Sequence, residues 1–181
     1  MKPVVFLDRD GTINEDVGYL FTWERLKFVP RAIEAMLLMQ NRFDLFVITN
    51  QTGIGERVFT MQEYQNFEGL FKTLLAAHGV EIKKTYCCPH LKAEGCLCRK
   101  PGTYFLMEAA KEYGIDLSAS YAIGDHPHDI EMGKNAGIKT VYVLSGHGLK
   151  HRSELTVQPD YIANDLYDAS VWILAQDQKG G

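Results

Sequence analysis

The sequence predicts an α/β fold that resembles a Rossmann fold, with a mostly parallel sheet and helices on both faces. Apolar, β-prone runs alternate with helical patterns along the 181 residues, and this alternation is typical of strand–helix–strand units. Several runs end in polar, glycine-containing loops, and open α/β sheets bind their ligands at such strand ends. The chain contains no internal repeat and no interdomain linker, so we expect residues 1–181 to form one domain.

The first predicted strand covers residues 4–7 and leads directly into two carboxylates. Val and Phe favour β structure, and side chains two positions apart on a strand share a direction. Asp8 and Asp10 would therefore point the same way, and Gly11 allows a sharp turn behind them. This arrangement places two acids at the carboxyl end of a buried strand. Residues 13–30 have no clear period and predict a loop.

The next part of the chain contains two predicted helices and two predicted strands. Residues 31–41 have helical periodicity, and Thr60-Met61-Gln62-Glu63 matches a capping box that would start a second helix. The apolar stripe of this helix is expected to pack in the core; it consists of Phe67, Leu70, Phe71, Leu74 and Leu75. Residues 43–48 and 82–88 predict strands. The first of these strands ends in the polar sequence that begins at Thr49.

The C-terminal half continues the alternation of helices and strands. Helices are predicted at 103–113, 129–136 and 166–175, and strands at 120–123, 140–144 and 161–163. Gly114 and Gly137 would end the first two helices, and Asp165 would cap the last one. The strand at 120–123 leads into Gly124-Asp125, so another acid follows a strand end. We expect the polar tail at 176–181 to fray.

Composition and charge exclude several functional classes. The chain is 46% hydrophobic and 23% charged, which fits a globular domain with a proper core. Its net charge of −4 indicates no general basic surface, so we expect no nucleic-acid partner. No apolar run approaches the roughly 18–20 residues that span a bilayer, and the N-terminus does not resemble a signal peptide. We expect a cytoplasmic monomer with no membrane partner.

Polar side chains at four predicted strand ends suit phosphoryl transfer. They are Asp8 with Asp10, Thr49 with Asn50, Arg99 with Lys100, and Asp125 with Asp129. The carboxyl ends of parallel strands lie on one edge of a sheet, so these groups can converge. A carboxylate can attack phosphorus, a second can protonate the leaving oxygen, and a lysine can bind the charged phosphoryl oxygens. Further carboxylates can hold Mg²⁺, which prefers oxygen ligands.

The four cysteines of the chain all lie within twelve residues, two of them at the end of the strand predicted at 82–88 and two after it. Such clustering favours a metal in a reducing compartment over a disulfide framework. The expected ligands of a closed, tetrahedral, structural Zn²⁺ site are Cys88, His90, Cys96 and Cys98. We therefore expect a zinc loop at about residues 87–99, with free thiols or a reversible disulfide as the alternative. Cys87 would point away from this site as a buried free thiol.

Together these motifs resemble those of the haloacid dehalogenase (HAD) superfamily of phosphatases. The matching residues, in the family's order, are Asp8-x-Asp10-Gly11-Thr12, Thr49 after an apolar strand, Lys100, and Gly124-Asp125-x-x-x-Asp129. The resemblance implies that Asp8 is the nucleophile and that Asp10 is the general acid/base. A general acid also separates phosphatases from dehalogenases, which have no leaving oxygen to protonate.

The same resemblance implies how the catalytic metal is held. Mg²⁺ would bind the Asp8 carboxylate, the Asp10 backbone carbonyl and the Asp125 carboxylate, and Asp129 would orient the metal site. The residues implied to stabilise the transferring phosphoryl group are Thr49 and Lys100.

Four segments are similar to a narrower group, the D,D-heptose 1,7-bisphosphate and histidinol phosphatases. They are Asp-Arg-Asp-Gly-Thr-Ile-Asn at 8–14, Thr-Asn-Gln-Thr-Gly-Ile at 49–54, Cys-Pro-His at 88–90, and Cys-x-Cys-Arg-Lys-Pro at 96–101. In that group a zinc loop stands in place of a large cap, so the resemblance implies a minimal cap. Its heptose branch removes the 7-phosphate during synthesis of the heptose precursors of lipopolysaccharide or surface glycans. The implied substrate is a small phosphorylated sugar, and the leading candidate is D-glycero-D-manno-heptose 1,7-bisphosphate.

The resemblance also implies a set of substrate-binding residues. Carried over by motif, they are Asp16, Gly18, Tyr19, Asn50, Gln51, Thr52 and Arg99. Arg99 would bind the distal phosphate or the sugar as a bidentate donor. The chain departs from the group at residues 55–58, where Arg57 is the candidate replacement for a displaced arginine. It also departs at His126, where the group often has Lys or Arg. Both departures affect substrate recognition rather than the reaction.

Three alternative functions remain at this point. Histidinol phosphate is the first alternative substrate, although Arg99 with Arg57 favours a substrate that keeps a second phosphate. A polynucleotide 3′-phosphatase would need a basic groove that binds a nucleic-acid strand, and the negative net charge of the chain disfavours such a groove. The third is a zinc-stabilised interaction module with a decayed active site, and the intact Asp8, Asp10 and Lys100 argue against it.

Overall fold

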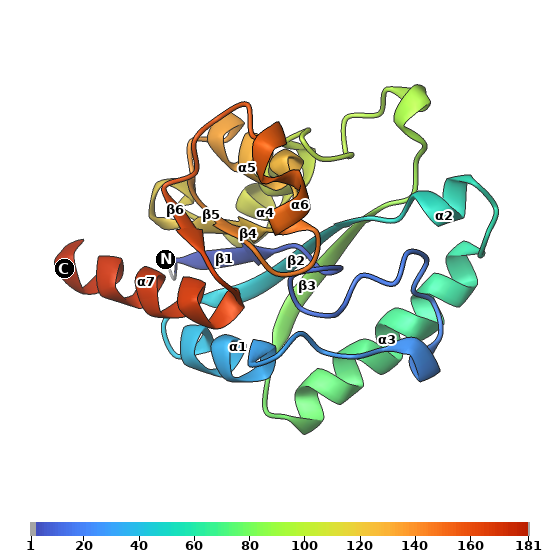
Figure 1. Ribbon diagram of the computed structural model, residues 1–181, viewed down its shortest axis with the longest axis horizontal. Helices are drawn as coiled ribbons and strands as arrows, with labels where there is room; N and C mark the ends of the chain where they lie inside the picture. The colour runs from blue at the N-terminus through green and yellow to red at the C-terminus, as the bar shows by residue number, and fades with distance from the viewer. Residues whose placement is uncertain (1–2, 181) are drawn as a thin grey trace.

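The structure is a computed structural model that describes residues 3–180, and it is built on one six-stranded parallel sheet (Figure 1). The strands are β1 (Val4–Leu7), β2 (Asp44–Asn50), β3 (Ile82–Cys88), β4 (Tyr121–Gly124), β5 (Lys139–Val143) and β6 (Tyr161–Ala163). Their order is β3-β2-β1-β4-β5-β6, and every neighbouring pair is parallel. The predicted Rossmann-like sheet is therefore confirmed. From β1 the successive strands extend first to one side (β2, β3) and then to the other (β4, β5, β6). Open α/β sheets bind ligands at such a switch point, here between β1 and β4.

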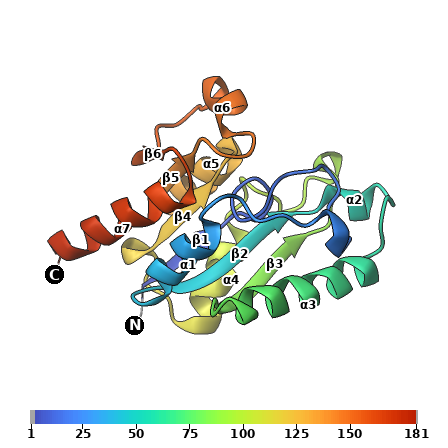
Figure 2. The ribbon, with the colours of Figure 1, turned by 60° about the horizontal axis from the view of Figure 1, so that its bottom comes forward.

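Helices cover both faces of the sheet, as predicted. They are α1 (Ala32–Gln40), α2 (Thr52–Gly55), α3 (Met61–Ala77), α4 (Tyr104–Tyr113), α5 (Pro127–Asn135), α6 (Gly148–His151) and α7 (Leu166–Gly180). Short 3-10 turns occur at Trp23–Arg25, Lys92–Glu94, Leu117–Ala119 and Arg152–Glu154. Helices α1, α3 and α7 pack on one face of the sheet, and α4 and α5 pack on the other (Figures 1 and 2). None of the helices in the described part of the chain has the length and apolar character needed to cross a membrane.

The central strand β1 is buried on both faces, which explains why its sequence is apolar at every position. Val5 and Leu7 belong to the core under α1, α3 and α7. Val4 and Phe6 belong to the core under α4 and α5. The parallel pairing of β1 with β2 and β4 sets its register, and Asp8 follows directly after the strand.

Helix α3 begins as predicted but buries a different stripe. The Thr60 side chain accepts the Glu63 amide hydrogen and the Glu63 side chain accepts the Thr60 amide hydrogen, which confirms the capping box. The buried side chains of the helix are Tyr64, Phe67, Phe71 and Leu75. The predicted core positions Leu70 and Leu74 are 49% and 40% exposed. They lie at the margin of the stripe, where the sheet no longer covers the helix.

Other differences from the prediction lie at the ends of elements. The helix predicted from residue 129 begins at Pro127, because His126 serves as its N-cap. The loop predicted after β2 contains the single turn α2. The predicted fraying of 176–181 is wrong for the described residues, since α7 continues to Gly180; Gly181 lies outside them. Gln and Lys are good helix formers, which explains the extension. The strands predicted at 82–88 and 161–163 are confirmed.

The observed core of α3 can be tested by matched alanine substitutions. Phe71→Ala should lower the free energy of unfolding by about 3–5 kcal/mol, because it leaves a cavity in place of a fully buried ring. Leu70→Ala, one position earlier, should cost less than about 1 kcal/mol because its side chain is half exposed. Urea unfolding of both variants measures the difference. Equal losses would mean that Leu70 belongs to the core after all.

Candidate active site

A cavity of about 310 Å³ lies at the carboxyl ends of β1, β2 and β4. Its lining includes Asp8, Asp10, Thr49, Lys100, Asp125 and Asp129. The structure thus brings together the four predicted groups of polar side chains. The prediction that Arg99 and Lys100 follow a strand end is wrong, because β3 ends at Cys88 and both residues lie in the loop after it. The predicted substrate residues also line it, with the exception of Arg57. Two histidines that were not among the predicted site residues, His128 and His147, line it as well.

Lys100 is the central cation of this cavity. Its Nζ lies 2.6 Å from Asp8 Oδ1 and 2.7 Å from Asp129 Oδ1, and it donates to the Ile48 carbonyl at 2.9 Å. Burial disfavours the charge of Lys100, but the ion pairs with Asp129 and Asp8 outweigh this effect and raise its pKa. The side chain therefore stays protonated. The Lys100 amide also donates to Asn50 Oδ1 at 3.1 Å, which fixes the backbone.

Three carboxylates surround this lysine. Oxygens of Asp8, Asp125 and Asp129 all lie within 4.8 Å of one another. Burial raises the pKa of Asp8 well above its usual value, Lys100 opposes this, and the two neighbouring carboxylates add to it. Burial and Asp129 raise the pKa of Asp125 to about 7. One lysine does not balance three buried acids, so the group is electrostatically suited to bind a cation. Its oxygen donors fit Mg²⁺.

Asp10 is held by donors on both of its oxygens. Arg9 donates from Nη2 to Oδ2 at 2.9 Å and from Nε to Oδ1 at 3.2 Å. Asn14 Nδ2 donates to Oδ1 at 2.9 Å, and Gln51 Nε2 donates to Oδ2 at 2.8 Å. Arg9 is completely buried and its guanidinium lies 5.1 Å from the centroid of the Phe67 ring. These contacts fix the orientation of the Asp10 carboxylate.

Arg9 and Asn14 are site residues that the sequence analysis did not identify. A signal for Arg9 exists, because a charged residue between two acids at the end of a buried strand must find a partner when it is buried. The signal for Asn14 is weaker. Its position depends on the turn at residues 10–14, where the Gly11 amide donates to the Asn14 carbonyl at 2.7 Å.

The side chains of Asn50 and Gln51 form hydrogen bonds to other protein groups, so their polar atoms are not free to bind substrate. The Gln51 side-chain amide donates to Thr49 Oγ1 at 2.8 Å in addition to Asp10, and the residue is only 5% exposed. Asn50 accepts from the Lys100 backbone, as described above. Both residues line the cavity, but their polar groups position the predicted catalytic side chains.

The predicted substrate residues Asp16, Gly18 and Tyr19 lie on the segment between β1 and α1, which extends toward α2 (Figure 2). Asp16 Oδ1 accepts the Gly18 amide hydrogen at 2.8 Å, and the Tyr19 hydroxyl bonds to Glu56. Arg57 is exposed in the turn after α2, where its φ of 60° is left-handed. The predicted role of Arg57 as a replacement arginine at the cavity is therefore not supported, because this turn brings Glu56 to Tyr19 and leaves Arg57 outside.

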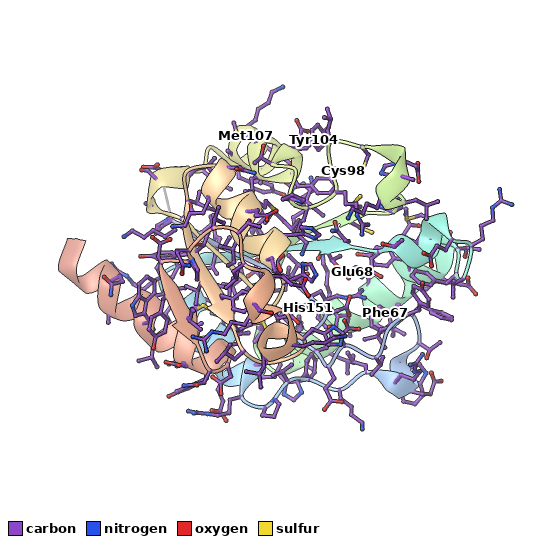
Figure 3. All side chains as sticks on the ribbon, turned by 45° about the horizontal axis from the view of Figure 1, so that its top comes forward. Phe67, Glu68, Cys98, Tyr104, Met107 and His151 are labelled. Carbon is purple, nitrogen blue, oxygen red and sulfur yellow. The ribbon has the colours of Figure 1, made fainter. Side chains whose placement is uncertain are left out.

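The cysteine loop carries a compact group of four potential metal ligands (Figure 3). The Sγ atom of Cys98 lies 3.3 Å from that of Cys88 and 3.6 Å from that of Cys96, and 3.2 Å from His90 Nδ1. Tetrahedral zinc–thiolate sites have ligand separations of about 3.7 Å, so the group fits Zn²⁺. Cys87 lies outside it, as predicted, but is half-buried rather than buried.

Arg99 connects this loop to the cavity. Its Nη1 donates to the Thr52 hydroxyl at 2.8 Å and to the His90 carbonyl at 3.2 Å. His90 is a member of the cysteine group, so the position of Arg99 depends on the geometry of that loop. On another side of the cavity, the His126 amide donates to Asp129 Oδ2 at 3.1 Å at the start of α5.

Comparison with known proteins places the chain among HAD-like hydrolases. A family model described as HAD-hydrolase-like matches residues 97–169. The D-glycero-beta-D-manno-heptose-1,7-bisphosphate 7-phosphatase of Yersinia pestis is 35% identical, with 92% of each chain covered. The corresponding alpha-anomer enzyme of Photorhabdus laumondii is 31% identical, with 92% of this chain and 94% of that one covered.

A solved structure agrees with these relatives. The D,D-heptose 1,7-bisphosphate phosphatase from B. bronchiseptica, complexed with magnesium and phosphate, superposes with a TM-score of 0.89 at 25% identity. The match covers 96% of this chain and 99% of that one. The arrangement of acids and lysine in the cavity and the full-length similarity lead to one conclusion: the chain is a HAD-type phosphatase and belongs to the family of the D-glycero-D-manno-heptose-1,7-bisphosphate 7-phosphatases.

Proposed function

We propose that this protein removes the 7-phosphate of D-glycero-D-manno-heptose 1,7-bisphosphate. The observation that carries the proposal is that one cavity holds two separate cationic side chains. Lys100 is paired with Asp8, where the phosphate to be removed would react, and Arg99 lies on the side of the cysteine loop. A sugar bisphosphate has a second phosphate for Arg99, whereas histidinol phosphate does not. The names of the relatives point to the same substrate.

In the proposed first step, the Asp8 carboxylate attacks phosphorus and the bond from phosphorus to the sugar oxygen breaks. The ion pair with Lys100 uses Asp8 Oδ1 and does not involve Oδ2. Asp10 donates a proton to the leaving sugar oxygen. Lys100 and Thr49 stabilise the charge of the transferring group. Because Arg9 holds both oxygens of Asp10, this side chain is already oriented before substrate binds.

In the second step, Asp10 accepts a proton from water as the water attacks the aspartyl phosphate. The bond between phosphorus and Asp8 breaks, and this releases inorganic phosphate and restores the carboxylate. Asp8 and Asp125, with the backbone carbonyl of Asp10, would hold Mg²⁺, and Asp129 would orient the metal site through its contact with Lys100. When bound, Mg²⁺ supplies positive charge to the phosphoryl oxygens.

We also propose that Cys88, His90, Cys96 and Cys98 hold a structural Zn²⁺ ion that fixes the loop behind Arg99. Four free cysteines suit a reducing compartment, so the proposed location is the cytoplasm. There the product would enter the synthesis of heptose precursors of lipopolysaccharide or surface glycans. The cavity is formed by a single sheet and its loops, which supports one domain that acts as a monomer.

A substrate panel tests the proposed function. It consists of both anomers of the heptose 1,7-bisphosphate, the heptose 7-phosphate and histidinol phosphate, assayed with Mg²⁺. We expect kcat/KM for one bisphosphate anomer to exceed that for histidinol phosphate by about 10- to 100-fold, the value of a charge-assisted contact to the second phosphate. Asp8→Asn should lose turnover on every substrate. If histidinol phosphate is the best substrate, the assignment fails while the reaction class survives.

Arg99→Gln provides the matched control for this panel. It should raise KM for the bisphosphate and leave the kinetics of the heptose 7-phosphate nearly unchanged, because the monophosphate has no distal phosphate. Equal effects on both substrates would contradict the role given to Arg99.

Magnesium affinity should fall as the pH is lowered through about 7. Burial and Asp129 raise the pKa of Asp125 to about 7, and a carboxylate must lose its proton to bind a metal. Binding at pH 6 should therefore release a proton, and binding at pH 9 should release none from this group. Calorimetric titration in buffers of different ionisation enthalpy measures the protons released. The exposed variant Asp116→Asn should behave as wild type, and pH-independent affinity in the wild-type protein would refute the prediction.

Protein purified without chelator should contain about one equivalent of zinc per chain. Cys96→Ser should lose the metal, whereas Cys87→Ser should retain it because Cys87 lies outside the ligand group. Loss of zinc should raise KM for the bisphosphate more than it lowers kcat, since Arg99 is bonded to the loop and Asp8 is not. Metal analysis and kinetics of both variants provide the measurement. Less than about half an equivalent in the wild-type protein would count against the site.

A further inference from the structure

A third group of potential metal ligands lies at the rim of the cavity, apart from the carboxylates and the cysteines. His126, His151 and Glu154 each offer a ligand atom, and these atoms lie within 4.8 Å of one another. His126 lines the cavity at the start of α5. His151 ends α6, and Glu154 lies in the 3-10 turn that follows it. Neither the relatives' names nor the proposed reaction gives this group a function.

We propose that His126, His151 and Glu154 form a binding site for a divalent transition-metal ion, with Zn²⁺ as the reference case. Two imidazoles and one carboxylate are a donor set that zinc accepts, with a fourth position left for another ligand. The nitrogen donors also select against Mg²⁺, which prefers oxygen. The site is therefore chemically distinct from the carboxylate group around Asp8.

The geometry needs only small side-chain movements to close around an ion. His151 Nδ1 lies 2.8 Å from Glu154 Oε1, and the ring centroids of His126 and His151 lie 5.0 Å apart. Nitrogen and oxygen ligands of tetrahedral zinc are about 3.3 Å from one another. The nitrogen–oxygen separation of His151 and Glu154 is shorter than this value, and the ligand atoms of all three residues lie within 4.8 Å of one another. The three side chains are half-buried or exposed, so they can adjust without disturbing the core.

The backbone that carries these ligands is fixed. The His147 amide, just before α6, donates to Asp125 Oδ2 at 2.8 Å. The Tyr142 hydroxyl donates to the Gly148 carbonyl at 2.8 Å. Gly148 packs so closely on β5 that an added Cβ atom would lie 1.9 Å from the Val143 carbonyl oxygen. Helix α6 is therefore held against the same strand ends that carry α5, and His151 is kept beside His126.

Binding of an ion must break one existing hydrogen bond. His126 Nδ1 accepts the His128 amide hydrogen at 3.3 Å, which is long for such a bond. A neutral imidazole has only one nitrogen with a free lone pair. If the ion binds Nδ1, the amide loses its acceptor; if it binds Nε2, the ring proton moves to Nδ1 with the same result. The His128 amide is thus a specific reporter of occupancy.

An ion at this site would add positive charge to the cavity rim. The three protein ligands leave its fourth position for water or for an anionic group in the cavity that His126 lines. This consequence does not depend on which phosphoester is hydrolysed.

The experiment is a Zn²⁺ titration of ¹⁵N-labelled protein that already carries zinc on its cysteines and is kept in excess Mg²⁺. We expect one further equivalent of Zn²⁺ to bind, with shifts of the His126 and His151 ring nitrogens and of the His128 amide. His151→Gln and Glu154→Gln should each weaken this step at least about tenfold. His78→Gln, exposed at the end of α3, is the control and should change nothing.

Glu154→Gln keeps the test decisive if His151→Gln fails to fold, because Glu154 is exposed. The proposal is overturned if both variants bind the additional Zn²⁺ as the wild-type protein does. It is also overturned if added Zn²⁺ shifts only resonances of the cysteine loop or of the Asp8 carboxylate group.

Discussion

The buried ammonium group of Lys100 is the interaction on which the site depends. It contacts Asp8 at the end of β1, Asp129 on α5 and the Ile48 carbonyl of β2. These elements are far apart in the sequence, and a single cation joins them at one strand edge. Removal of one partner from such a buried ion pair typically costs about 3–5 kcal/mol. The same charge that would stabilise a phosphoryl group therefore also holds the carboxylates in place, so the proposed catalytic role and local stability share one residue.

A second buried ion pair, between Arg9 and Asp10, separates the two acids into different environments. Asp8 faces the ammonium of Lys100 and other carboxylates, whereas Asp10 is held by guanidinium and amide donors. Environments that differ in this way allow two chemically identical side chains to take different roles. The cysteine loop is joined to the same cavity, because Arg99 bonds to the His90 carbonyl and lines the cavity. The proposed zinc site would therefore act on substrate binding without touching the reacting groups.

Much of the site was predictable because its residues follow strand ends, and a parallel sheet brings such ends to one edge. This reasoning accounts for Asp8, Thr49 and Asp125, which line one cavity at that edge, whereas Lys100 reaches it from the loop after β3. It did not predict that Gln51 would be bonded to Asp10, or that Arg57 would lie outside the cavity. Those outcomes depend on the path of individual loops, and a repeating pattern does not encode loop paths.

The sequence by itself determined the strands, the order of the motifs and the spacing of the cysteine loop, because periodicity and short-range spacing are local properties. The tertiary structure decided which apolar residues of α3 are buried, since neighbouring elements leave Leu70 at the margin. It also decided that Arg9 pairs with Asp10 and that His126 lies beside His151. The last two residues are 25 positions apart in the chain. Only the packing of α5 and α6 on the same strand ends brings their rings together.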